Sequence, residues 1–502
     1  MSDLPTEPNV NTDQTDQSEA PFRDLFWRKL RLGVLAGIVG GLVFGASMLQ
    51  TGTLPTIAGI VRADSAFVGF VVHMVVAVIV GGVFGLLLLY QRPGVGETLF
   101  WGLSYGTFWW FLGPLTLLPL FLGQGLNWNL VAAQQAFASF VGHVIYGAST
   151  ALTLLVVERW RHHDAPHLHP WPLLGGAVAG VLAAWILGGA FAAQNGFAAL
   201  VGVAEQGGTM LRLLFGAVLG LTFALLYPQP SERAGVGLVR GTVYGFLGWL
   251  VGVLSIIPLI RQGRLAWTLT EAQERVGALL GLLLLGALTA LLYRWIVGAS
   301  RALFGAEVRG REAEGVGTQG LRAIARGVPA GLVGGVLFTV VMVQLDLLPN
   351  VAGLVGSEDR LIGLAVHLAV ATLIGMSYGV LFRAQSVEIG SALGWGVSYG
   401  FFWWLLGALT LLPALLGSGP TWSAAAAADA FGSLVGHLAY GAGLGVTFYL
   451  LEIRYSPWWI SHREYRRQKA EQHKREVLTA APALWGQMVV IALTLPLLLG
   501  RV

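Results

Sequence analysis

The sequence contains no cysteine and little charge. Without cysteine the chain has no disulfide, thiolate nucleophile, iron–sulfur cluster or cysteine-ligated zinc, so any chemistry must use histidine or carboxylate side chains. Charged residues make up 11% of the 502 residues, whereas a soluble domain carries roughly a quarter. This scarcity of charge excludes a water-soluble fold of this size.

A secretory signal is lacking as well. Residues 1–20 are polar, hold five acidic side chains and contain no apolar run of the kind that a signal peptide needs. We therefore predict a disordered tail over residues 1–27. The first membrane span then serves as its own insertion signal.

The chain also lacks the usual signatures of an enzyme. It has no carboxylate pair, nucleophile elbow, phosphate-binding loop or complete set of metal ligands. The sequence therefore predicts a protein without enzymatic activity and without a metal centre.

Apolar sequence is abundant, at 55% of all residues, and it is repeated. The segment WGLSYGTFWWFLGPLTLLPL (101–120) matches WGVSYGFFWWLLGALTLLPA (395–414) at 15 of 20 positions, with an offset of 294. The same offset aligns His73 with His367. An internal repeat of this strength indicates that a whole structural unit was duplicated.

A third copy lies between these two, at an offset of 139 from the first. It aligns Tyr105 with Tyr244 and Pro119 with Pro258. In chain order we name the predicted membrane repeats copy one (28–160), copy two (173–296) and copy three (327–453). Residues 297–326 are predicted to form a cytoplasmic linker.

Each copy holds four apolar stretches that could cross a hydrocarbon core of about 30 Å. They are 32–50, 66–90, 98–121 and 133–157, then 173–193, 209–228, 238–260 and 272–296, then 327–345, 361–382, 391–415 and 428–451. The predicted fold is an all-α, polytopic transmembrane helical bundle of three tandem four-helix repeats. A further C-terminal span is predicted at 483–500, although Pro496 and its short length leave a re-entrant or interfacial segment as the alternative.

Glycines spaced four residues apart occur on several of these stretches. Examples are Gly37 with Gly41 and Gly81 with Gly85. Lipid gives no hydrophobic drive between helices, so such pairs predict close packing of the helix backbones.

The basic residues predict the orientation. With the N-terminus in the cytoplasm, most of the 30 Lys and Arg fall on the cytoplasmic side of a cell inner membrane. The basic, amphipathic segment 454–480 would then lie against anionic lipid headgroups. Nucleic acid is a poorer partner for so short a tethered segment, and the oligomeric state is left open.

Four histidines within the predicted spans are the main candidate site residues. His73 and His143 lie at similar predicted depth in copy one, and His367 and His437 repeat them in copy three. Ionisable groups in a membrane are costly and therefore candidates for function. Three interpretations remain open: neutral histidines that hydrogen-bond between helices, a proton relay or solute site, and a bis-histidine haem.

Arg212 occupies the position of His73 in copy two. A guanidinium within a span must reach headgroups, a carbonyl or an anion. The alternatives are that it snorkels to the surface, binds an anionic solute, or pairs with Glu205, Glu271 or Glu274.

Tryptophans mark the middle of each third span. They are Trp109, Trp110, Trp249, Trp403 and Trp404. Because aromatic belts lie at the membrane surfaces and not at mid-span, we interpret this group as packing surfaces or, alternatively, as the lining of a cavity. Trp128, Trp267 and Trp422 follow a proline after each third span and are predicted to be interface anchors.

The order of these features resembles the YagU-like family of bacterial inner-membrane proteins. The residues that carry the resemblance in copy one are His73, Trp101, Pro119, Phe140-Val141-Gly142-His143 and Glu158-Arg159. They recur in copy three as His367, Trp395, Pro413, Leu434-Val435-Gly436-His437 and Glu452. The resemblance implies a multi-pass cytoplasmic-membrane protein with no established enzyme activity. Triplication and the missing histidines of copy two depart from that family.

Three functions follow as hypotheses. The first is permeation or transport of protons or a small solute past the histidine pairs. The second is a haem-binding membrane subunit that uses the same pairs, which would make haem the one cofactor. The third is a structural or scaffold protein, in which the glycine and tryptophan surfaces serve assembly.

Overall fold

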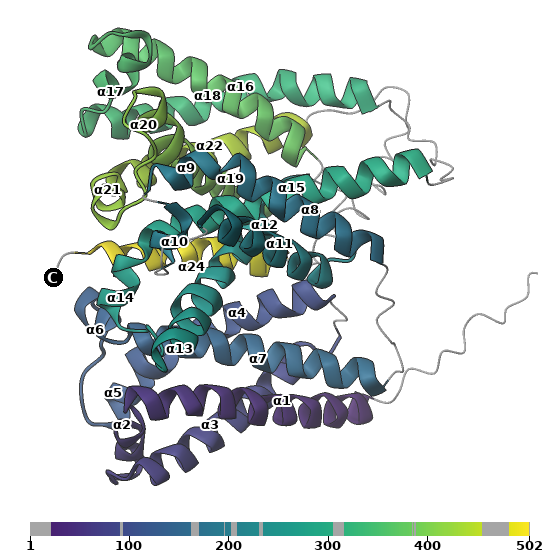
Figure 1. The fold of residues 1–502 in the computed structure, drawn as a ribbon, viewed down its shortest axis with the longest axis vertical. Helices are drawn as coiled ribbons and strands as arrows, with labels where there is room; N and C mark the ends of the chain where they lie inside the picture. Colours follow the sequence, from purple (N-terminus) through teal and green to yellow (C-terminus); the bar gives the residue numbers. More distant parts are fainter. Residues whose placement is uncertain are drawn as a thin grey trace, which may run out of the picture.

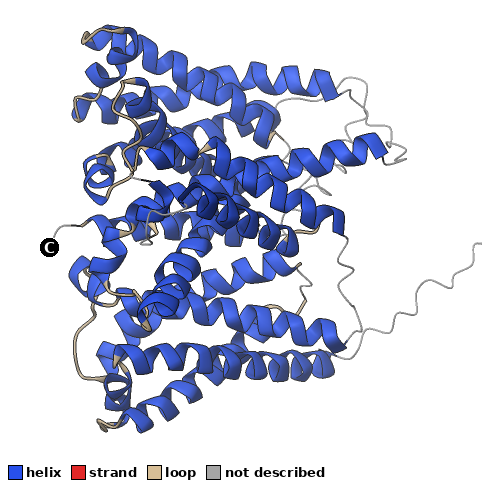
Figure 2. Ribbon diagram, viewed as in Figure 1, coloured by secondary structure: helices blue, strands red, loops and turns tan. Residues whose placement is uncertain are grey.

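The computed structural model describes residues 22–90, 94–161, 170–194, 196–201, 208–229, 234–304, 316–383, 385, 388–453 and 481–500. Within these ranges every regular element is a helix (Figure 2). Ten of the helices in this part of the chain are long and apolar enough to cross a membrane. The chain is therefore an all-α, multi-pass membrane protein.

The long helices follow the predicted spans. Copy one contains α1 (Phe22–Thr51), α3 (Ala66–Leu87), α4 (Val95–Leu112) and α7 (Phe137–Arg161). Copy two contains α8 (Pro170–Ile186), α11 (Gly208–Leu226), α12 (Ala234–Gly248) and α15 (Val276–Phe304). Copy three contains α16 (Val316–Gln344), α18 (Arg360–Phe382), α19 (Ile389–Trp403) and α22 (Phe431–Ile453), and α24 (Ala481–Leu499) comes last.

Several predicted boundaries need correction. The helix α1 begins at Phe22, so the last residues of the predicted tail are helical. Both α15 and α16 extend into the predicted linker 297–326. The helices α4, α8 and α24 are not among the ten candidate spans, so the count of twelve spans plus one stays a prediction. The basic segment 454–480 lies outside the described residues.

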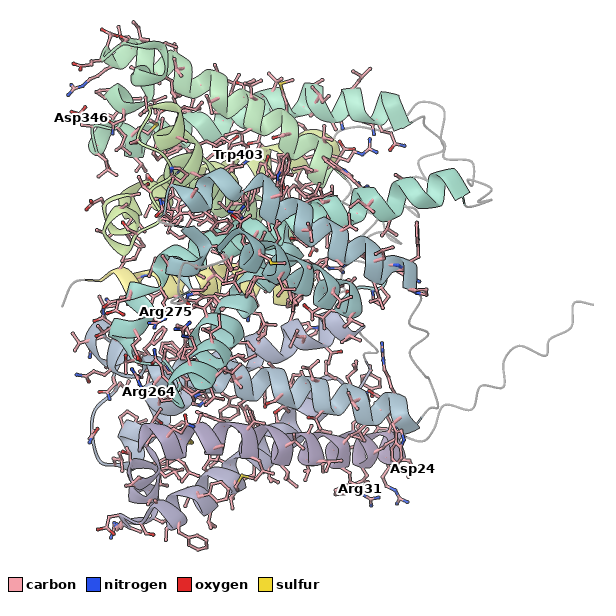
Figure 3. All side chains as sticks on the ribbon, viewed as in Figure 1. Asp24, Arg31, Arg264, Arg275, Asp346 and Trp403 are labelled. Atoms are coloured by element: carbon pink, nitrogen blue, oxygen red, sulfur yellow. The ribbon has the colours of Figure 1, made fainter. Side chains whose placement is uncertain are left out.

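The two ends of the molecule differ (Figure 1). The short-helix end carries α2 (Leu54–Ala58), α6 (Leu130–Gln135), α14 (Leu269–Glu274), α17 (Leu348–Ala352) and α21 (Ala424–Asp429). The linker end carries the start of α1 and the last turns of α7, α15 and α22. In Figure 3 the labelled charged residues lie at the two ends, with Asp24 and Arg31 at the linker end and Arg264, Arg275 and Asp346 at the other. Charge at both ends of an apolar middle is the pattern that a bilayer requires.

The packing of helices is the same in copies one and three. The helix α1 packs on α3 and on α7, and α7 packs on α4; α16, α18, α22 and α19 repeat this order. Glycines allow the contact: a Cβ on Gly37 would lie 2.5 Å from the carbonyl oxygen of Ala77, and one on Gly81 would lie 2.4 Å from the Cα of Gly37. The predicted close packing of the glycine helices is therefore present.

In each copy the third long helix changes from α to π geometry before it ends. The π segments are Gly113–Leu117, Trp249–Ile256 and Trp404–Leu411. A hydroxyl within or at the end of each segment bonds a carbonyl five residues earlier: Thr116 to Phe111, Ser255 to Leu250, and Thr410 to Leu405. Each hydroxyl thus adds a side-chain hydrogen bond to the backbone of its own helix.

The proline that follows each π segment leaves one carbonyl of the helix without its usual backbone partner. Pro119 has no N–H to give to the residue four places earlier, and the carbonyl of that residue, Leu115, accepts instead from the backbone N–H of Asn127 at 3.1 Å. The matching bonds are Ala266 to Leu254 at 3.0 Å and Thr421 to Leu409 at 2.9 Å. In each copy the loop that follows the third long helix is therefore hydrogen-bonded to that helix.

The tryptophans after the prolines complete this connection, and two of the three are not surface anchors. Trp128, Trp267 and Trp422 each donate their indole N–H to the hydroxyl of the π segment, at 3.0 Å in every case. Trp128 is 59% exposed, but Trp267 and Trp422 are only 4% and 2% exposed. The prediction of interface anchors is wrong for the last two, because neighbouring copies cover them.

This difference in burial gives a testable result. Trp267→Phe is expected to lower the free energy of unfolding by about 2 kcal/mol, because it removes one hydrogen bond and leaves a small void. Trp128→Phe removes the same bond at an exposed site and should cost less than half as much. Denaturant or thermal unfolding in detergent micelles measures both. Equal losses in the two variants would contradict this account.

Ion pairs lie at the linker end, within and between copies. Lys29 of α1 pairs with Glu158 of α7 at 2.8 Å, and Glu452 of α22 pairs with Arg326 of α16. Arg240 of α12 reaches Glu97 of α4 at 2.7 Å, with 13% and 18% of the two side chains exposed. The last pair joins copy two to copy one.

Candidate functional site

A cavity of about 440 Å³ lies in copy one, in its half toward the short-helix end. Its walls come from α1, α3, the π segment 113–117 and α7, and Trp267 of copy two closes part of the rim. His73 and His143 both line it, and so do Trp109 and Tyr146. The helices α3 and α4 do not pack closely on each other, which leaves the space between them.

The two histidines of copy one lie on either side of one phenylalanine. The ring centroid of Phe44 on α1 is 5.3 Å from that of His73 and 4.9 Å from that of His143. Room for this ring comes from Gly142, where a Cβ would lie 1.9 Å from the Phe44 ring. The glycine of the FVGH sequence therefore positions the phenylalanine between the histidines.

Hydrogen bonds fix the proton positions on the rings. His73 Nε2 lies 2.9 Å from the carbonyl oxygen of Gly41, and His143 Nδ1 lies 2.8 Å from that of Ser139. A carbonyl only accepts, so each of these nitrogens must carry its proton and donate. In neutral His143 the other nitrogen, Nε2, then has a free lone pair, and a Cβ on Gly113 would lie 3.7 Å from it. The cavity therefore has a hydrogen-bond acceptor in its wall.

The rest of the lining is apolar with a set of uncharged polar groups. The polar side chains besides the histidines are Ser47, Thr51, Thr53, Thr56, Asn127, Gln135, Ser139 and Tyr146. No Asp, Glu, Lys or Arg is among the residues that line the cavity. Such a surface suits a neutral solute, because an ion would find no opposite charge.

Copy three reproduces the histidines but only part of the polar lining. His367 Nε2 donates to Gly335 at 3.0 Å, His437 Nδ1 donates to Ser433 at 2.8 Å, and the Phe338 ring lies between the two histidine rings. The positions aligned with Ser47, Thr51 and Thr53 are Val341, Leu345 and Leu347. The other five aligned positions stay polar, as Asn350, Thr421, Asp429, Ser433 and Tyr440. The change is therefore confined to the first helix of the copy and the turn that follows it.

Among the described residues, Arg212 of copy two bonds a carbonyl and no carboxylate. Its Nη1 lies 3.4 Å from the oxygen of Gly188. Glu271 instead pairs with Arg264 at 2.5 Å, and Glu274 pairs with Arg275 at 3.7 Å. The predicted alternatives of a Glu271 or Glu274 partner for Arg212 are therefore wrong, and Glu205 lies outside the described residues.

Glu271 has its own structural role at the short-helix end. Burial would raise the pKa of its carboxyl, but hydrogen bonds from Thr268 and Arg264 outweigh burial and hold the pKa below its ordinary value. Together with Thr268 it forms a capping box at the start of α14.

The mid-span tryptophans divide into two groups. Trp110, Trp249 and Trp404 donate their N–H to the carbonyls of Ala136, Arg275 and Ala430, at 3.0, 2.9 and 3.0 Å. Each of those carbonyls lies at the break between a short helix and the fourth long helix of its copy. Trp109 lines the cavity, and Trp403 is the aligned residue of copy three, labelled in the middle of Figure 3. The packing interpretation holds for the first group and the cavity interpretation for Trp109.

The residues of copy one do not fit a bis-histidine haem. The Phe44 ring contacts both histidines, and His73 already uses Nε2 to bond Gly41. Two ring nitrogens are therefore not presented to one iron. Among the described residues no group of three His, Asp or Glu side chains could hold a metal ion.

Sequence reasoning brought the four histidines and Trp109 to attention, but it missed the hydroxyl and amide groups near them. Thr51, Thr53 and Thr56 belong to a turn between two helices, where such residues are ordinary. The signal in the sequence is the replacement of Thr51 and Thr53 by Leu345 and Leu347 in the aligned turn of copy three. No family model, curated protein or solved structure matches this chain.

Proposed function

We propose that this chain is a membrane transport protein that binds a small neutral polyhydric solute in the cavity of copy one. The observation that carries the proposal is the uncharged lining of the cavity, which includes His143, whose Nε2 is left as an acceptor when Nδ1 donates to Ser139. A polyol has hydroxyls on one side and C–H groups on the other, which matches a wall of hydroxyls and amides beside apolar side chains. Polyols also cross lipid slowly, so that a protein route has a use.

The proposal includes the arrangement of the repeats and their orientation in the membrane. Three tandem copies of one four-helix unit, related by an axis along the membrane normal, would make twelve spans, and α24 would add one more. With the N-terminus in the cytoplasm, the cavity opens toward the outer side of an inner membrane. The resemblance to YagU-like proteins supports the membrane class and says nothing of the solute.

Close packing supports a route that is closed at one end. Between the cavity and the linker end, α1 and α3 touch through Gly33, Gly81 and Gly85, where an added Cβ would meet backbone atoms. A solute in the cavity is therefore open to one side and blocked from the other, as alternating access requires.

Uptake of glycerol and xylitol into proteoliposomes tests the proposal. The unmodified chain is expected to speed uptake above protein-free liposomes, and His143→Phe to reduce the protein-dependent part on the order of tenfold, since it removes the acceptor and fills the cavity. His437→Phe makes the same change in copy three and should leave uptake unchanged. Equal uptake by liposomes with and without the protein would refute the proposal and favour a scaffold role.

A further inference from the structure

The C-terminal helix α24 lies between the copies (Figure 1). It packs against α4, α12 and α19, which are the third helices of copies one, two and three. These three helices pack on α24 more extensively than on one another. At the short-helix end α24 also contacts α6, α14 and α21, again one element from each copy. The helix therefore occupies an axis that all three copies surround.

Burial agrees with an axial position. None of the α24 side chains that the structure describes is exposed, and Met488, Ile491, Leu495 and Leu498 are each at most 2% exposed. A helix at the outside of a membrane bundle presents one face to lipid, whereas one that is covered all round lies in the interior.

Two glutamines related by the repeat bind the last turn of α24. The last four carbonyls of a helix have no partner within the helix. Gln134 Nε2 donates to the carbonyls of Leu497 and Gly500, both at 3.0 Å, and Gln273 Nε2 donates to that of Leu498 at 2.8 Å. Gln134 and Gln273 occupy the same position in copies one and two, so both copies hold the same end of the helix.

The other end of α24 is held by different contacts. Gln487 Nε2 donates to the hydroxyl of Ser104 on α4 at 3.0 Å. The ring of Trp485 lies edge-on to that of Trp395 at 5.3 Å and fills the space beside Gly394, where a Cβ would lie 2.6 Å from the indole. Both ends of α24 are therefore fixed to third helices or to the short helices that follow them.

We propose that the three copies form an axial socket and that α24 is the helix that seals it. A helix with its side chains is about 10 Å across. Without α24 the helices α4, α12 and α19 would enclose a path of that width, because they do not pack closely on one another. The three hydrogen bonds from Gln134 and Gln273 keep the sealing helix docked at the short-helix end. No residue of α24 lines the cavity of copy one.

Leakage of carboxyfluorescein from phosphatidylcholine–phosphatidylglycerol proteoliposomes tests the seal. The unmodified chain should retain the dye. The double variant Gln134→Ala, Gln273→Ala loses the hydrogen bonds that hold the last turn and should leak on the order of tenfold faster. Gln124→Ala, at an exposed site on the same side, is the matched control and should retain the dye.

A reversible lock makes the test specific. The chain has no cysteine, so Ser104→Cys with Gly486→Cys gives one defined pair, and a Cβ on Gly486 would lie 3.7 Å from Ser104 Oγ. The disulfide should form on oxidation. In the glutamine double variant it should stop the leak, and a reductant should restore it.

Several results would overturn the proposal. They are failure of the two cysteines to cross-link in the otherwise unmodified chain, retention of the dye by the glutamine double variant, and a leak that the disulfide does not change. The cross-link is measured without the glutamine substitutions. It therefore tests whether α24 lies against α4 even where the glutamine double variant does not fold. Polyol uptake that fails while the dye results hold would refute only the transport proposal.

Discussion

Gly81→Ala is expected to destabilise the protein by about 3 kcal/mol, although alanine is the better helix former. The new Cβ would lie 2.4 Å from the Cα of Gly37 and 2.6 Å from the carbonyl oxygen of Gly33. Both are backbone atoms of α1, so relief requires the two helices to move apart. Separation would also disturb the wall of the cavity, because α1 and α3 both line it.

Thermal unfolding in detergent micelles, followed by circular dichroism, measures this effect. The matched control is Gly298→Ala on α15, where nothing lies within 4 Å of the added Cβ. That change should stabilise the chain by about 0.5 kcal/mol through helix propensity alone. Opposite signs in the two variants support the packing account, and a stabilised Gly81 variant would refute it.

Arg240→Met is expected to cost about 3 kcal/mol, because it leaves the carboxylate of Glu97 without its partner in a largely buried place. The guanidinium also lies 4.7 Å from the centroid of the Tyr227 ring, and this contact is lost too. Since Glu97 belongs to copy one and Arg240 to copy two, the loss should loosen the contact between copies.

A double-mutant cycle separates the charge from the packing. The variant Arg240→Met, Glu97→Leu removes both charges and should recover most of the stability, because a buried apolar pair replaces a buried ion pair at little cost. Arg360→Ala is the control: its pair with Asp346 is 69% and 60% exposed, and such pairs contribute about 0.5 kcal/mol. If the double variant were as unstable as Arg240→Met, an unpaired Glu97 would not be the cause.

Much of the fold was predictable from periodic, local information. Each run of about 20 apolar residues overlaps one of the long helices, and an ungapped offset pairs His73 with His367 from the sequence alone. Helix ends were less predictable, since α1 begins at Phe22 amid polar residues. Length and hydropathy do not report where a helix continues beyond the apolar core.

The cavity and the axis were not predictable, because both depend on contacts between distant segments. Gln134 and Gln273 look like ordinary polar residues of a loop until the end of α24 is placed beside them. The π segments were equally hidden, although the hydroxyl and proline that accompany each one are visible in TLLP and SIIP. A single sequence shows which groups are unusual and does not show which of them meet.

The bonds that fasten each third helix to its following loop have an evolutionary consequence. The hydroxyls of Thr116, Ser255 and Thr410 do not line the cavity, and of the three indoles bound to them only that of Trp267 does. The hydrogen bonds that hold these loops and the lining of the cavity therefore share one side chain, that of Trp267. Substitutions in the lining, such as Leu345 and Leu347 in place of Thr51 and Thr53, can therefore accumulate while the bonds that hold the third helices are kept.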